Sequence, residues 1–231
     1  MSRFPVRSIL TAASAAAVII SFTSPVLADD TGFYVGANVG RVLSSYRRAD
    51  IDKAFTAAAG GQSGGFALGP SSVDKSHVMW SADVGYFLSR NFAIEASYLN
   101  LGSLRYSGFG TQTLGGKSSV ISANLETKSH GPALALIGIL PMSDIWEVHA
   151  RFGGYQGKTI STFSFGFGPD TSTGRQSQTS TSLLAGVGTA LTLSSHYQIR
   201  LDYIRLQRLK ENVFRNSFNV DLVTVGAAYV F

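Results

Sequence analysis

Histidines, carboxylates and serines are the residues of this sequence that could support acid–base or nucleophilic chemistry, and their spacing argues against both. A hydrolase needs a nucleophile within reach of a histidine base, which a carboxylate orients. The histidines are His77, His130, His149 and His196. His149 has Glu147 and Arg151 at the two-residue spacing that shares one strand face, and no serine stands there. Isolated histidines without a carboxylate cluster at ligand spacing also argue against a metal site. We therefore expect no catalytic residue, no metal and no cofactor.

Charged residues of both signs do, however, recur at alternate positions of otherwise apolar segments. In "IWEVHARFGGY", Glu147, His149 and Arg151 alternate with apolar residues, which is the period of a β-strand with one polar face. The set that shares this pattern is Asp83, Glu95, Glu147, His149, Arg151, Arg200 and Asp202. Charges that face a narrow, poorly solvated interior must pair to offset their desolvation. The set therefore predicts either a satisfied ion-pair core or a gate whose pairs exchange to admit ions.

Eight segments alternate in this way and could form the strands that position these residues. The first three are apolar on one side and small or polar on the other, and the fifth alternates most clearly, whereas the fourth is apolar on both sides and does not fix its own register. The segments are Gly32–Val42, Met79–Leu88, Phe92–Leu101, Pro132–Leu140, Ile145–Tyr155, Ser182–Leu193, Tyr197–Leu206 and Asn219–Phe231.

Composition suggests that the outside of this sheet does not face water alone. Charged residues make up 14% of the chain, against roughly 25% in ordinary globular domains. The run from Pro132 to Pro141 is too short for a spanning helix and matches a tilted membrane strand of about 9 to 11 residues. Because an open sheet would leave unpaired backbone groups in hydrocarbon, we expect a closed barrel.

The first 28 residues have the pattern of a secretory signal peptide. Arg3 and Arg7 precede an apolar or small stretch from Ile9 to Phe22, and "SPVLADD" then places the small residue Ala28 at the expected cleavage point. Removing residues 1–28 takes away these two arginines and no acid, so the net charge falls from +5 to +3. We expect residues 29–231 to form a single barrel domain.

The connections between the segments predict the topology. Tight turns around residues 89–91, 142–144 and 194–196 alternate with long connections at 43–78, 102–131, 156–180 and 207–217. Short turns that alternate with long loops around an even number of strands are typical of outer-membrane barrels. The expected fold is an all-β, transmembrane, antiparallel up-and-down β-barrel of eight strands, or of ten if residues 163–167 double back as a hairpin.

The sequence resembles the small outer-membrane β-barrels of the OmpA and OmpX type. The resemblance is carried by "GFYVGANVG", "VGYFLSRNFAIEASYLNLG", "ARFGGY", "QIRLDY" and the terminal "VGAAYVF", and it covers all eight strands but little of the loops. It implies that Tyr229 and Phe231 form the C-terminal signal read by the barrel-assembly machinery. Thr189 stands where some relatives carry a charge, which argues against a gate, and no His-x-Ser motif like that of lipid A deacylase barrels is present.

The long loops offer two sets of contact candidates. Arg205, Arg208, Lys210 and Arg215 stand against Glu211 alone, so they could meet phosphates of lipopolysaccharide or an anionic host surface, or extend a solvated strand. Phe163, Phe165 and Phe167 recur at period two, as a barrel wall rising above the membrane or as an exposed patch for a partner. In the first loop a short helix is possible over residues 49–59.

These observations predict a structural and surface-interaction protein of the Gram-negative outer membrane, with extracellular loops and periplasmic termini. The expected partners are outer-membrane lipid and lipopolysaccharide, the assembly machinery and a host or surface ligand, with no nucleic acid. A small passive transport pore is the alternative, and a lipid A modifying enzyme is the third.

Overall fold

The computed structural model describes residues 31–44, 52–53, 56, 66–74, 78–114, 117–167, 170–210 and 217–231. Nearly all of them lie in β-strands, and no helix among them is long and apolar enough to cross a membrane. The strands are β1 (Gly32–Ser44), β2 (Phe66–Asp74), β3 (Val78–Ser89), β4 (Phe92–Leu114), β5 (Lys117–Pro141), β6 (Trp146–Phe167), β7 (Asp170–Thr192), β8 (Tyr197–Lys210) and β9 (Ser217–Val230).

Eight of these strands close into a barrel. Each pairs antiparallel with its neighbour in the order β1-β3-β4-β5-β6-β7-β8-β9, and β9 pairs back with β1. The closing contact places Val35 opposite Tyr229, and the Phe231 amide donates to the Phe33 carbonyl at 2.9 Å. The predicted up-and-down barrel of eight strands is confirmed. The ten-strand alternative is wrong, because residues 163–167 continue β6 without turning back.

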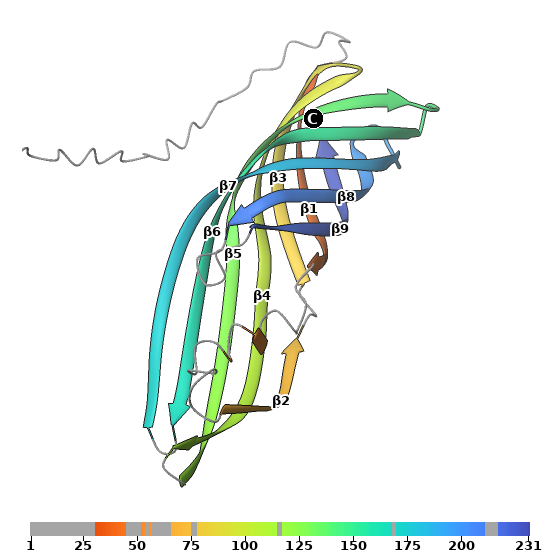
Figure 1. The fold of residues 1–231 in the computed structure, drawn as a ribbon. Coiled ribbons are helices and arrows are strands. Elements are labelled where there is room, and N and C mark those ends of the chain that lie inside the picture. Colours follow the sequence, from red (N-terminus) through yellow and green to blue (C-terminus); the bar gives the residue numbers. More distant parts are fainter. Residues whose placement is uncertain are drawn as a thin grey trace, which may run out of the picture.

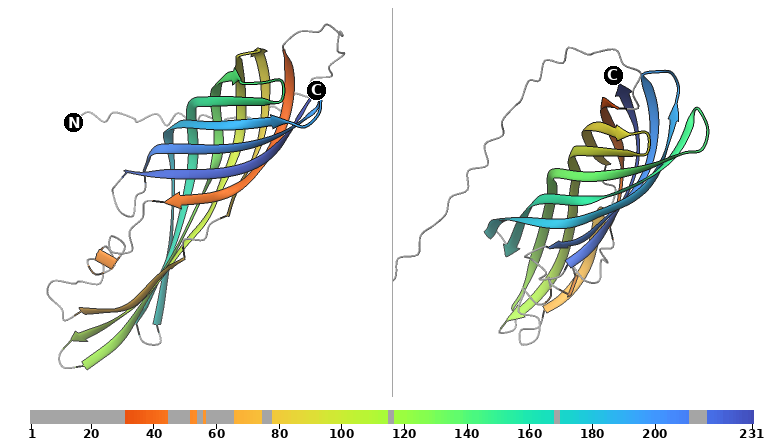
Figure 2. Two further views of the ribbon diagram at one scale, coloured as in Figure 1. Left: turned by 90° about the vertical axis from the view of Figure 1, so that its right-hand side faces the viewer. Right: turned by 90° about the horizontal axis from the view of Figure 1, so that it is seen from above.

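The ninth strand, β2, belongs to an extension of the barrel wall on one side. Residues 92–100 of β4 pair with β3, whereas residues 105–112 pair with β2 on the same edge. Strands β4 to β7 run on well past the barrel (Figures 1 and 2), so that β2, β4, β5, β6 and β7 form an open sheet beyond it. Among the described residues, β8 pairs with β7 only over Leu183–Thr192.

Two of the four connections predicted as long loops are therefore strands. Residues 102–131 and 156–180 form the ends of the β4–β5 and β6–β7 hairpins, and only residues 115–116 and 168–169 lie outside the described strands. Antiparallel pairing along both hairpins satisfies the backbone hydrogen bonds on at least one edge of every strand. These segments therefore need no apolar face to be ordered. A one-residue bulge at residues 100–103 includes Gly102 at a φ of 75°, a left-handed conformation that glycine adopts without strain.

The opposite end of the barrel has tight connections, as predicted. Turns follow β3, β5 and β7 at residues 90–91, 142–145 and 193–196, and the C-terminus lies at this end (Figure 2). In the first long connection Asp52, Lys53 and Thr56 are helical, and the rest of the helix considered for residues 49–59 lies outside the described residues. Residues 211–216 of the fourth connection also lie outside them.

The two faces of the wall follow the predicted alternation. Val39, Val84, Phe152 and Leu201 point outward and are exposed, while Asp83, Glu95 and Asp202 are buried inside. The register that the sequence left open in β5 is settled by size. Leu134, Leu136 and Leu140 face outward, and the smaller Ala133 and Ala135 face the interior with Ile137.

Aromatic residues gather at two levels of the outer face. Near the tight turns the Phe33 and Tyr86 rings lie 4.6 Å apart, and Tyr229 contacts Tyr197 and Phe231 at 5.3 and 5.0 Å. Near the extension Trp80 lies 6.1 Å from Tyr98. Outer-membrane barrels carry such girdles at both membrane interfaces, so the apolar band between these two levels is the surface that lipid would cover.

The outward position of Ala150 makes a direct test of this band. Ala150→Arg should lower the free energy of unfolding in lipid vesicles by about 2–4 kcal/mol, because an arginine near mid-bilayer loses its hydration. Equilibrium urea unfolding measures the change. Ser164→Arg, on the same face of β6 but in the extension, is the control and should be close to neutral. A neutral Ala150→Arg would mean that this face does not meet lipid.

Candidate functional site

The charged residues singled out in the sequence lie inside the barrel, on four strands. Asp83 comes from β3, Glu95 from β4, Glu147, His149 and Arg151 from β6, and Arg200 and Asp202 from β8. All are buried except Glu147, which is partly exposed. The alternation of each strand aims these side chains at the barrel axis, and closure of the ring brings residues more than 50 positions apart into contact.

Arg151 is the centre of the cluster. Its guanidinium donates to Glu95 Oε1 at 3.0 Å and to Asp202 Oδ1 at 2.9 Å, with 3.5 Å to His149 Nε2. Arg200 donates to the second oxygen of Glu95 at 3.2 Å, so that one carboxylate joins two arginines. At distances near 3 Å and with almost no solvent exposure, these contacts form a continuous network rather than separate pairs.

Neutral residues complete the network. The Tyr34 hydroxyl donates to Glu95 Oε2 at 2.8 Å, and the Arg200 guanidinium carbon lies 4.3 Å from the centre of the Tyr34 ring. Asn38 donates to the Asp83 carboxylate and, at 2.9 Å, to the Ser81 hydroxyl. Sequence reasoning placed Tyr34 and Asn38 on the small or polar face of the first strand but did not connect them with the charges. Both residues alternate with the apolar residues of that strand, so their position on the inner face could have indicated that they contact the charges.

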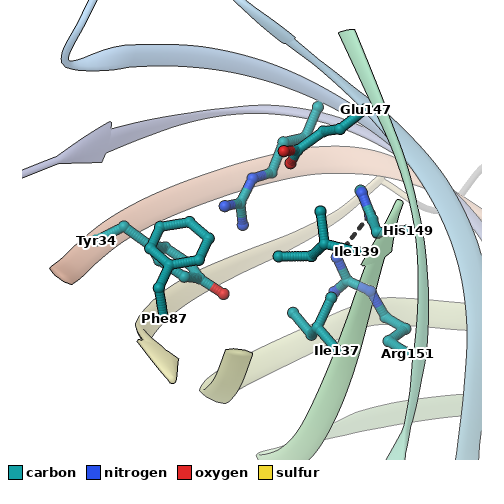
Figure 3. A pocket seen from close by; sticks show the side chains of 8 residues that line it. Tyr34, Phe87, Ile137, Ile139, Glu147, His149 and Arg151 are labelled. Carbon is teal, nitrogen blue, oxygen red and sulfur yellow. Dashed lines mark hydrogen bonds between the residues drawn. The ribbon is translucent and has the colours of Figure 1, made fainter. Parts of the chain in front are cut away.

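Glu147 differs from the other charged residues. It lines the end of the interior nearest the tight turns, with His149 and Arg151 below it and Tyr34 and Phe87 across from them in the view of Figure 3. Among the described residues its carboxylate has no hydrogen-bond or salt-bridge partner, and it keeps partial contact with solvent. It belongs to the interior but not to the bonded network.

The histidines lie in three different surroundings that do not resemble a catalytic triad. His149 Nε2 lies 2.6 Å from Asp202 Oδ1 and faces Arg151, with no hydroxyl partner among the described residues. His130 Nδ1 lies 2.7 Å from the Tyr98 hydroxyl, and His196 Nδ1 lies 2.7 Å from the Ser195 hydroxyl in an exposed turn. His77 lies outside the described residues. No group of histidines and carboxylates able to hold a metal ion occurs in the described part of the chain.

Glycines on neighbouring strands leave the space that the network occupies. A Cβ at Gly188 would meet Asp202 Oδ1 and His149 Nε2, and one at Gly186 would approach the Arg151 side chain. A Cβ at Gly85 would fall on the Tyr34 ring, and one at Gly36 would come within 3.3 Å of Asp83. The glycine-rich inner face is therefore part of the site, because long charged side chains fit only where the opposite wall has none.

Apolar layers enclose the charges on both sides. Toward the tight turns lie Tyr34, Ala93, Ile137, Ile139 and Ala228. Toward the extension lies a larger layer of Met79, Leu99, Leu101, Ala133, Ala135, Tyr155, Leu184, Ile204, Leu206, Val220 and Leu222. Cavities of about 10 Å³ remain beside the charges on either side, which is room for about one water molecule each. The described interior is packed rather than open.

The family follows from a comparison of the sequence. A family model for the OmpA-like transmembrane domain matches residues 28–231. The chain belongs to this family. Together with the closed eight-stranded ring, this makes the protein an outer-membrane β-barrel.

Known proteins resemble this OmpA-like barrel only distantly. No curated protein matches the sequence. The attachment invasion locus protein Ail of Yersinia pestis shares 14% identity at a TM-score of 0.45, over 88% of this chain and 99% of Ail. The N-terminal barrel domain of Pseudomonas aeruginosa OprF shares 12% identity at a TM-score of 0.43, over 88% of this chain and 98% of that domain. The outer membrane protease OmpT of Escherichia coli shares 9% identity at a TM-score of 0.41, over 87% of this chain and 94% of OmpT.

One interpretation of the interior needs correction. Thr189 was compared with an interior charge of some relatives, but in this OmpA-like barrel it lies on the outer face. It accepts from Trp146 Nε1 at 2.5 Å and donates to the Glu147 carbonyl at 2.8 Å. The interior positions beside it are Gly188 and Ala190. The segment "LLAGVGTALT" is small or apolar on both faces, so its alternation did not fix the register.

Of the basic residues of the fourth connection, the structure describes the side chain of Arg205. Arg205 donates to both carboxylate oxygens of Asp221 on β9, at 2.7 and 3.1 Å, which neutralises it. The sequence analysis missed Asp221, because this residue pairs across strands and stands 16 positions away. The side chains of Arg208 and Lys210 and the whole of Arg215 lie outside the described part.

The phenylalanines of the third connection lie on the inner side of the extension. Phe163 packs against Tyr106 and Leu125, and Phe165 packs against Ile121 and Ala123. The side chain of Phe167 lies outside the described residues. These contacts fit the barrel-wall alternative rather than a freely exposed aromatic patch.

The space at Gly188 provides a test of the packed interior. Gly188→Ala should lower the free energy of unfolding by about 1–3 kcal/mol, because the new methyl group displaces Asp202 or His149. Gly154→Ala is the matched control on β6, since a Cβ there meets nothing within 4 Å, and its effect should stay within about 0.5 kcal/mol. Urea unfolding in vesicles measures both. Equal effects would mean that the network adapts to lost space and is not closely packed.

Proposed function

We propose that this barrel is a non-enzymatic structural and surface-interaction protein whose lumen is closed and whose strand extension faces the outside of the cell. The observation that carries the proposal is the paired charge network, enclosed between two apolar layers. An ion crossing the barrel would have to separate Arg151 from its carboxylates and then pass the larger apolar layer. A lumen built in this way supports rigidity rather than transport.

The orientation is part of the proposal. Long strand extensions on one side and tight turns on the other match the arrangement in which turns face the periplasm and loops face outward. Tyr229 and Phe231 then lie at the periplasmic end, where we propose that they act as the assembly signal for the barrel-assembly machinery. Phe231 is 71% exposed, so it is accessible to such a partner in the folded chain.

The extension is the surface that we propose for external contacts. Residues 170–182 of β7 pair with β6 on one side. On the other side, beyond the last pairing with β8, they have no strand partner among the described residues, so they form an open sheet edge. Unpaired edge amides and carbonyls are able to accept an added strand. A host or surface ligand would meet this part of the molecule first.

Single-channel conductance tests the proposal. The folded barrel in a planar bilayer should show no steady discrete openings, because the paired charges and the apolar layers leave no continuous path for ions. Folding is verified beforehand by the faster gel migration of the unheated barrel. Arg105→Gln, which changes a charge outside the lumen, should be equally silent.

Steady openings that change with Arg151→Ala but not with Arg105→Gln would overturn the proposal. That outcome would make the interior charges a gate and favour the passive transport pore. A role in lipid A modification would be shown instead by altered lipid A in cells that lack the protein.

A further inference from the structure

On the outer face of β4 to β7, the apolar surface gives way to polar residues within two cross-strand rows. Leu134 and Leu136 on β5 and Phe152 on β6 are exposed on the barrel side of these rows. The first row holds Tyr98 and Pro132 with the polar Gln156 and Thr181, and the next row holds Asn100, His130, Lys158 and Thr179. This change from apolar to polar residues marks the expected boundary of the hydrocarbon region on this side of the barrel.

Aromatic residues mark the same level independently. Tyr98 lies one outward position below Asn100 on β4 and is bonded to His130, and its ring lies 6.1 Å from that of Trp80. Tyrosine and tryptophan concentrate at the headgroup level of membranes, where one end of the side chain is apolar and the other is wet. Residues in the next rows above therefore stand at the height of lipid headgroups.

Four cations occupy these rows. Lys158 lies in the first row, Lys128 in the second beside Ser103, Ile160 and Ser177, and Arg105 and Arg175 in the third with Glu126 and Thr162. All four cations are exposed. Strand spacing places Arg105 and Arg175 about 14 Å apart, and Lys128 and Lys158 are diagonal neighbours at about 7–8 Å.

One acid lies among them. Glu126 contacts Arg105 at 3.1 Å and Lys128 at 3.4 Å, and no ion pair involves Lys158 or Arg175 within the described part. Burial raises the pKa of Glu126, but hydrogen bonds from Arg105 and Lys128 outweigh it and hold this pKa below its usual value. With Glu126 ionised, the four cations keep a net charge of +3.

The opposite wall carries a smaller excess. On β8 and β9, Arg205 is bound to Asp221 through both carboxylate oxygens, so this pair carries no net charge. Arg41 on β1 is a further exposed cation, so the four cations of β4 to β7 are the largest group on the described outer rim.

We propose that Arg105, Lys128, Lys158 and Arg175 form a binding site for the phosphate groups of the outer-leaflet glycolipid. The proposal rests on the proposed function in one respect, that the extension faces the outer leaflet. Guanidinium and ammonium groups bind phosphate through charge-assisted hydrogen bonds, and the site stands where a lipid in the membrane holds its phosphates. A lipid headgroup, rather than a soluble anion, fits because the acyl chains of the same molecule would lie on the apolar band below.

Binding of fluorescent bis-phosphorylated lipid A to the barrel in zwitterionic micelles tests the site. Lys158→Gln should weaken binding about fivefold, since a cation near an anionic lipid surface is worth about that factor. Glu126→Gln should strengthen binding, because it removes the competing carboxylate. Arg205→Gln, which removes the same charge on the opposite wall, is the control and should change binding less than twofold.

Three outcomes would overturn the proposal. Equal losses of lipid A affinity in Lys158→Gln and Arg205→Gln would show that binding depends on net charge alone. Equal binding of dephosphorylated lipid A would show that phosphate is not recognised. Displacement of the lipid by inorganic phosphate at concentrations matching the lipid would make the ligand a soluble anion.

The orientation of the barrel is tested in a separate experiment, so that a failure of the proposed orientation can be told apart from a failure of the phosphate site. The chain has no cysteine, so Ser118→Cys in the extension and Ser143→Cys in a tight turn can each be labelled alone. A membrane-impermeant maleimide on intact cells should label only the first. Labelling of the second alone would reject the outward orientation while leaving lipid binding in micelles unaffected.

Discussion

The interior of this barrel depends on one constraint: charges that leave water need opposite charges or hydrogen bonds in place of their hydration. An unpaired ion in a poorly solvated lumen costs several kcal/mol. Arg151 and Arg200 meet this requirement through Glu95 and Asp202. The remaining features of the interior follow from it. Glycines such as Gly188 provide the volume, Tyr34 and Asn38 donate hydrogen bonds to Glu95 and Asp83, and apolar layers enclose the charges on both sides.

The outer surface depends on a second constraint, because each strand passes from surroundings of lipid to surroundings of water. Between the aromatic levels the outward residues are apolar, and above them cations and hydroxyl side chains take over. Backbone pairing is unaffected by this change, so β4 to β7 leave the membrane without ending. The extension and the phosphate site that we propose at its base both arise from this continuity.

Much of the barrel could be predicted from alternation, because lipid on one side and a packed lumen on the other impose opposite residue types. This was sufficient for most strand faces and for the inward set from Asp83 to Asp202, and the need to pair backbone groups in lipid predicted a closed ring. Strand ends could not be predicted in residues 102–131 and 156–180. Both faces of the sheet there are polar or mixed, so the period-two signal fades although pairing persists.

Contacts between strands were also beyond the sequence. The bulge at Gly102 shifts the β4 register, and no local pattern specifies which residue of β9 faces Arg205. The comparison of Thr189 with a charged position of some relatives failed for a related reason, since its segment is small or apolar on both sides and does not show which face Thr189 occupies. Such errors arise where the two faces of a strand do not differ in chemistry.

The coupling energy between Glu95 and Arg151 tests the central claim of a dry, paired lumen most directly. A double-mutant cycle of Glu95→Gln, Arg151→Gln and the combined variant, followed by urea unfolding in vesicles, measures it. For a buried pair the account predicts a coupling of about 1–3 kcal/mol. Additive effects, with coupling within about 0.5 kcal/mol of zero, are expected of a solvated pair. That result would contradict the account and describe a hydrated lumen.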